Sequence, residues 1–85
     1  MKKVNQYQLD IKAHNQLGAL ERILRVIRHR GGRIESMDMQ TDHANMMELS
    51  IKLTTEKSIE MLQSQVAKLV DVIAANSSAV IIESL

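Results

Sequence analysis

The residues from Asn15 to Met39, NQLGALERILRVIRHRGGRIESMDM, decide how this chain folds. The middle of this stretch repeats apolar residues at the i, i+3, i+4 and i+7 positions of one helical face: Leu20, Ile23, Leu24 and Ile27. Gly31 and Gly32 end the helix, because glycine adopts the left-handed conformation after a helix without steric cost. Gly18 precedes the helix at a strand-to-helix turn, where the free N–H groups of the first helical turn offer hydrogen bonds to a ligand.

Alternation of apolar and polar residues predicts strands on both sides of this helix. The first strand has one apolar face and one polar face, as in a sheet that is covered on one side only. The expected elements are a strand over 4–13, the helix over 18–30, a strand over 33–40, a strand over 47–53, a helix over 56–69 and a strand that begins at Val70. This βαββαβ order predicts an α+β fold of the ferredoxin-like type, a four-stranded antiparallel sheet with two helices on one face. The chain is expected to form a single domain, 1–85.

Local signals refine several of these elements. A bulge near Glu35–Ser36 reconciles the two parities of apolar residues along the second strand. Thr54 and Thr55 offer an N-cap for the second helix. Asn76–Ser78 predicts a turn, and Val80–Ile82 predicts a short extra strand or an extension toward a partner. Four methionines are expected to fill a core that is poor in aromatic residues: Met37, Met39, Met47 and Met61.

Composition argues against several classes of protein. The chain has no cysteine, so it forms no disulfide and no cysteine metal site. It has no apolar run of the ~18 residues that a transmembrane helix needs. Met1–Lys3 carries two lysines, but no apolar segment follows, so the N-terminus does not read as a signal peptide. A cytoplasmic location without membrane association is therefore expected.

The sequence offers no catalytic constellation. It contains no P-loop and no Gly-x-Ser-x-Gly nucleophile motif. Its histidines, His14, His29 and His43, show no i, i+4 pairing of the kind that binds zinc on a helix. We therefore expect a non-catalytic protein with no metal and no cofactor of its own.

The arginines are concentrated in one segment. Between Gly18 and Arg33 five Arg stand against one Glu, a local charge of +4, whereas the whole chain carries +1. Arg22, Arg25 and Arg28 fall on the polar face of the first helix, and three interpretations stay open for them. They form a solvated helix face, a docking surface for an acidic protein partner, or a nucleic-acid site. The last is the weakest, because Tyr7 is the only aromatic residue and a base-stacking sheet needs several.

The residues also resemble a known family. Asn15-x-x-Gly18-Ala19-Leu20, a helix that ends in Arg28-x-Arg30-Gly31, and then Ile34-Glu35-Ser36-Met37 resemble the ACT domain of acetolactate synthase regulatory (small) subunits. Lys68-Leu69-Val70-Asp71-Val72 repeats a further motif of that family. The resemblance covers about residues 4 to 74 and is closest to the short small subunit of isozyme II.

The resemblance implies a regulatory role. Such a subunit activates a large catalytic subunit that carries thiamine diphosphate, Mg²⁺ and usually FAD. That large subunit is a transferase, which condenses pyruvate with a second 2-oxo acid in branched-chain amino-acid biosynthesis (valine, leucine and isoleucine). Two alternatives stay open: a stand-alone amino-acid-sensing ACT module and, more weakly, an RNA-binding domain.

The resemblance also implies an effector site between two copies of the chain. Regulatory ACT domains associate side by side, so a homodimer through sheet edges near the second strand is expected. The positions that match the family's amino-acid site are Asn15, Leu17, Gly18, Ala19, Leu20, Arg33 and Ile34. Valine-responsive relatives have Asn where this chain has Arg33, which predicts weak or absent valine binding.

Overall fold

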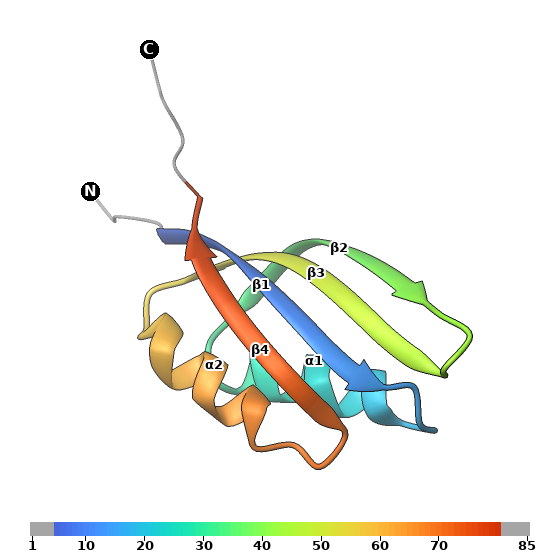
Figure 1. Ribbon diagram of the computed structural model, residues 1–85. Coiled ribbons are helices and arrows are strands. Elements are labelled where there is room, and N and C mark those ends of the chain that lie inside the picture. Colours follow the sequence, from blue (N-terminus) through green and yellow to red (C-terminus); the bar gives the residue numbers. More distant parts are fainter. Residues whose placement is uncertain (1–4, 81–85) are drawn as a thin grey trace.

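The computed structural model describes residues 5–80, and these form six elements in the predicted order (Figure 1). The elements are β1 (Asn5–His14), α1 (Ala19–His29), β2 (Arg33–Thr41), β3 (Met46–Thr55), α2 (Ile59–Ala67) and β4 (Val72–Ala79). The strands form one sheet in the order β2-β3-β1-β4, and every neighbouring pair is antiparallel. Both helices lie on one face of the sheet, so the predicted ferredoxin-like α+β fold is confirmed (Figure 1).

The core lies between the helices and the two central strands. The register of β1 and β3 places Leu9 opposite Ile51 and Ile11 opposite Leu49, and all four side chains are buried. Ile23 and Ile27 of α1, together with residues of α2, cover them from the helix side. Because successive residues of a strand point to opposite faces, the polar residues between these positions lie on the open face of the sheet.

The predicted bulge is present in β2. The pairing of β2 with β3 shifts between Ile34 and Ser36, so Glu35 is the extra residue. As a result Ile34, Met37 and Met39 all lie opposite inward-facing residues of β3. This bulge confirms the interpretation of the broken alternation along the second strand.

The two glycines after α1 are required for different reasons. Gly31 adopts the left-handed conformation, with φ +92°. Its N–H donates to the carbonyl of Arg28, and the N–H of Gly32 donates to the carbonyl of Ile27, which is the Schellman pattern of helix termination. Gly32 instead serves close packing, since a Cβ built on it would lie 2.7 Å from Cγ2 of Ile27 and 3.1 Å from Cδ1 of Leu62.

The second helix and the last strand differ from the prediction. The helix begins at Ile59 and ends at Ala67, and Ser58 caps it by accepting a hydrogen bond from the N–H of Met61. Thr54 and Thr55 instead belong to β3, because their pairing with Gln6 and Asn5 extends the ladder to the end of β1. The last strand begins at Val72, since the chain between Lys68 and the strand forms turns.

The turn predicted at Asn76–Ser78 was wrong. These residues lie inside β4, where Asn76 pairs with Asp10 and Ser78 with Gln8. Ser77 is held by the side chain of Gln63 in α2, which accepts from the Ser77 hydroxyl and donates to the carbonyl of Ala75. The predicted extension at Val80–Ile82 lies outside the described residues except for Val80, whose N–H donates to the carbonyl of Gln6.

The methionine prediction was correct only for Met47, which is fully buried. The other three predicted core methionines, Met37, Met39 and Met61, are substantially exposed. Met37 and Met39 do point to the helix side, but β2 is an edge strand that α1 does not cover completely. The alternation of residues therefore predicted correctly which face of the sheet Met37 and Met39 occupy. It did not predict their burial, which depends on how far the helices extend over β2.

The close packing at Gly32 leads to a test of stability. Gly32→Ala should lower the free energy of unfolding by about 1–3 kcal/mol, because the new methyl group overlaps Ile27 and Leu62. Ser64→Ala, on the exposed side of α2, is the control and should change it by less than ~0.5 kcal/mol. Urea unfolding followed by circular dichroism measures both. Equal stability of Gly32→Ala and the natural chain would show that α1 and α2 can separate without cost.

Candidate functional site

The connection between β1 and α1 has a defined shape. Gly18 adopts the left-handed conformation at φ +80° and occupies the N-cap position of α1. Asn15 does not cap the helix. Its N–H donates to the carbonyl of Asn45, and its own carbonyl accepts from the Asn45 side chain. The connection (residues 15–18), hereafter called the effector loop after the role predicted for it from the sequence, is thus tied to the turn between β2 and β3.

A hollow of about 390 Å³ lies between the effector loop, the start of α1 and the ends of β2 and β3. Four predicted effector residues line it: Asn15, Leu17, Gly18 and Leu20. Ala19 is buried beneath them. Gln16 and Glu21 also line it, and Met39 and Met47 complete the wall. Both methionines were predicted in the core, where Met47 does lie, but not at this hollow. Their position near the strand ends that meet the loop was the signal that could have placed them here.

Arg33 and Ile34 lie at the opposite end of the sheet from this hollow. β2 runs parallel to β1, so its last residue, Thr41, lies near the effector loop and its first residue lies away from it. Eight residue steps along β2 separate Arg33 from Thr41, about 26 Å at the usual rise per residue. The fold of one chain therefore brings together only part of the predicted effector site.

The three predicted docking arginines are exposed on α1, but their surroundings differ. Arg22 forms an ion pair with Asp71, with Nη2 and Oδ2 2.6 Å apart, and donates to the carbonyl of Leu17. Arg25 and Arg28 border a shallow groove with Glu21, and neither side chain pairs with another group in the part of the chain that the structure describes. Two guanidinium groups are thus left available to a partner.

An apolar strip follows the edge of the molecule beside β2. It consists of Leu17 on the effector loop, the partly buried Leu20 and Leu24 on α1, and the exposed Met37 and Met39 on β2. Leu17 is 99% exposed. The backbone of β2 is paired with β3 on one side only, so apolar side chains and free hydrogen-bonding groups occur along the same edge.

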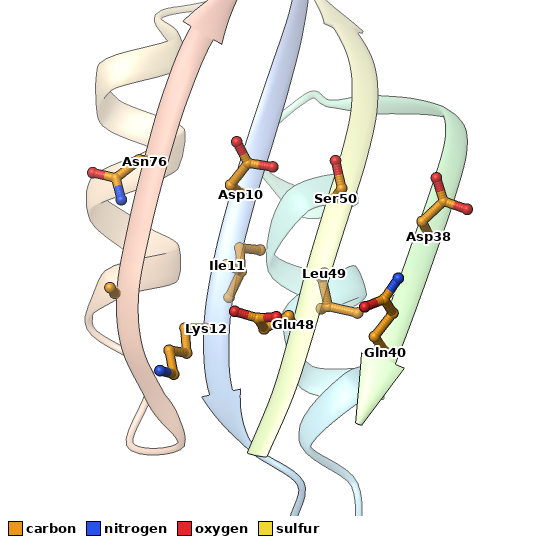
Figure 2. Close-up of a pocket in the computed structure, with 10 residues that line it drawn as sticks. Asp10, Ile11, Lys12, Asp38, Gln40, Glu48, Leu49, Ser50 and Asn76 are labelled. Atoms are coloured by element: carbon orange, nitrogen blue, oxygen red, sulfur yellow. The ribbon is translucent and has the colours of Figure 1, made fainter. Parts of the chain in front are cut away.

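The open face of the sheet holds a second hollow, of about 490 Å³, lined mainly by polar residues, which come from all four strands (Figure 2). Asp10, Ser50 and Asp38 form one cross-strand row, and Glu48 lies in the next row. Tyr7 is on the other face, packed against the core. Carboxylates repel phosphate groups and no lining residue stacks on a base, so this face does not fit the RNA-binding alternative.

Other site types find no match in residues 5–80. They include no group of three or more His, Asp or Glu side chains placed to hold a metal ion. No helix among them is long and apolar enough to cross a membrane.

The chain matches known proteins over most of its length. Residues 15–75 match the family model of the ACT domain. The chain is 38% identical over 68 residues to the acetolactate synthase isozyme 2 small subunit of Escherichia coli (strain K12), which covers 79% of this chain and 78% of that protein. The chain belongs to this family of ACT-domain small subunits. The acetolactate synthase isozyme 2 small subunit of Shigella flexneri matches equally well.

Solved structures support the ACT-type fold. The ACT domain of the GTP pyrophosphokinase of Chlorobium tepidum superposes with a TM-score of 0.77 at 12% identity, over 89% of this chain and all of that domain. The P2 domain of the chemotaxis kinase CheA from Thermotoga maritima gives 0.74 at 8% identity, over 92% of this chain and all of that domain. Because such distant domains share the fold, the fold by itself assigns no function to this family member.

Proposed function

We propose that this chain is the non-catalytic regulatory subunit of an acetolactate synthase, and that it binds and activates the catalytic subunit in the cytoplasm. The observation that carries the proposal is the 38% identity to the isozyme 2 small subunits, which extends over most of both chains. The catalytic subunit would hold thiamine diphosphate, Mg²⁺ and FAD. This chain would contribute no reacting group, and would act by favouring the catalytically competent conformation of its partner.

The exposed face of α1 is the docking surface that we propose. Arg25 and Arg28 project there without a partner among the described residues, and Arg makes bidentate bonds to carboxylates at low desolvation cost. We therefore infer an acidic patch on the catalytic subunit. Arg22 contributes less directly, because its guanidinium is already bonded to Asp71.

Reconstitution with the catalytic subunit tests both the function and the docking surface. The natural chain should make no acetolactate alone and should raise the rate of the catalytic subunit several-fold. Arg25→Glu/Arg28→Glu should need about tenfold more chain for half-maximal activation, since it reverses the charge at the interface. Lys12→Glu/Lys52→Glu is the matched control, with the same charge change on the open face of the sheet.

Three outcomes are informative. A rate that the natural chain leaves unchanged would refute the proposed function. Equal activation by both double variants would show that the arginines form only a solvated helix face. Binding of an amino acid without binding of the catalytic subunit would favour the stand-alone sensing module.

We also propose that two copies pair through β2. The outer edge of β2 pairs with no other strand in residues 5–80, and the apolar strip lies along the same side, so a second copy would cover both. Two β2 strands related by a two-fold axis run antiparallel, so Arg33 of each copy would approach Thr41 of the other. This arrangement would unite the two halves of the effector site: Asn15, Leu17, Gly18, Ala19 and Leu20 from one copy, and Arg33 and Ile34 from the other.

Sedimentation equilibrium tests the dimer. The natural chain should be dimeric at micromolar concentration, and Met37→Lys/Met39→Lys should be mainly monomeric because lysines at a strand edge oppose pairing. Met61→Lys is the control, since it changes another exposed methionine on α2. A natural chain that stays monomeric up to nearly millimolar concentration would exclude pairing through β2.

Arg33 bears on the response to valine. It is exposed at the start of β2, and a guanidinium only donates hydrogen bonds, whereas the amide of Asn also accepts from an ammonium group. The reconstituted enzyme should therefore show weak or no inhibition by valine, and Arg33→Asn should increase its sensitivity. Valine titration of the acetolactate rate measures both. Strong inhibition of the natural enzyme below millimolar valine would show that Arg33 does not block the site.

A further inference from the structure

Arg22 of α1 bonds to two other segments: the effector loop that precedes its own helix, and the connection between α2 and β4, 49 positions further along the chain. Its Nη2 lies 2.6 Å from Oδ2 of Asp71, which stands in the connection between α2 and β4. The same nitrogen donates to the carbonyl of Leu17 in the effector loop, at 3.3 Å. One guanidinium on α1 therefore holds the effector loop against the α2–β4 connection. We name the Arg22–Asp71 pair the clasp.

Asp71 is held in place by its burial and by its backbone carbonyl. It is almost fully buried, and its carbonyl accepts a hydrogen bond of 2.8 Å from the N–H of His14 at the end of β1. Its side chain is thus presented to Arg22 from a fixed point on the central strand. The carboxylate and the guanidinium form a charge-assisted hydrogen bond, which is stronger than a neutral one.

The lack of a side chain at Gly18 leaves room for the guanidinium of the clasp. A Cβ built on this residue would lie 2.9 Å from Nη1 of Arg22. Because Nη2 is bonded to Asp71 and Leu17, moving the guanidinium away from such a contact would break these hydrogen bonds. The shape of the effector loop and the position of the clasp therefore depend on each other.

Among residues 5–80, the two most exposed large apolar side chains lie in the two segments that the clasp joins. Leu17 is 99% exposed and Val70, next to Asp71, is 89% exposed. The hollow lies on the β2 side of the effector loop, whereas the clasp holds the loop from the α2–β4 side. Because the clasp bonds the loop to the α2–β4 connection, a change in the hollow that moves the loop would also act on that connection.

We propose that Arg22 and Asp71 are positioning residues that couple the effector loop to the α2–β4 connection, and that activation of the catalytic subunit requires the two segments to be held together. The first half of this proposal, the coupling between the two segments, concerns this chain alone. The second half, the requirement for activation, rests on the proposed function. The clasp acts through the loop and does not itself touch an effector.

Hydrogen exchange of the full chain, measured by NMR, tests the first half. Arg22→Gln should speed exchange of the His14, Gln16 and Ala19 amides about tenfold, because these amides bond within the clasped segments. The amides of Leu9 and Ile11, in the centre of β1, should keep their rates. Asp71→Asn should give the same pattern, and Arg22→Gln/Asp71→Asn should be no worse than either single change.

Arg25→Gln is the matched control, since it removes the same charge from the same helix without touching the clasp. It should leave all these exchange rates unchanged. Uniformly faster exchange throughout Arg22→Gln, or equal effects of Arg22→Gln and Arg25→Gln, would overturn the clasp as a local device.

Activation of the catalytic subunit tests the second half. At saturating chain, Arg22→Gln and Asp71→Asn should lower the maximal activated rate several-fold, an effect that added chain does not restore. Full activation by variants whose loop exchange is raised would overturn the coupling to activation. If the natural chain fails to activate at all, the proposed function falls, whereas the exchange data still decide whether the clasp holds the loop.

Discussion

The central position of β1 is the constraint on which the rest of the structure depends. This strand pairs with β3 on one side and β4 on the other, so its backbone has no freedom to slide. Its inward residues Leu9, Ile11 and Ala13 are all buried, and a shift by one residue would turn them to water. The end of β1 therefore fixes where the effector loop begins, and His14 fixes Asp71 at the same end.

The elements that the sequence predicted well are those that depend on local periodicity. The first strand, the arginine-rich helix and the bulge at Glu35 all follow from which residues can share an apolar face. The errors occur where long-range packing decides. Asn76–Ser78 has the composition of a turn, yet pairing with β1 and the side chain of Gln63 hold it as a strand. Periodicity also cannot show that β2 is an edge, and so Met37 and Met39 were assigned to the core.

The candidate site shows the same division. Gly18 and the start of the helix were predictable from the sequence, and four of the predicted residues line the hollow beside them: Asn15, Leu17, Gly18 and Leu20. Arg33 and Ile34 entered the site through family resemblance, and in one chain they lie at the far end of β2. The ion pair between Arg22 and Asp71 spans 49 positions, and the charged pattern of the helix face does not predict such a partner. It required the fold to place the α2–β4 connection beside the helix.

The bulge in β2 has a consequence for how this strand can change in length. Ile34 and Ser36 already pair with adjacent residues of β3, Leu53 and Lys52, with Glu35 as the surplus residue between them. Deleting Glu35 would leave every other side chain of the strand on its present face. A deletion elsewhere between Ser36 and Thr41 would exchange the two faces for part of the strand, unless the bulge moved to absorb it. Length variation among related chains is therefore best tolerated at Glu35, two positions from Arg33, the residue on which the proposed response to valine depends.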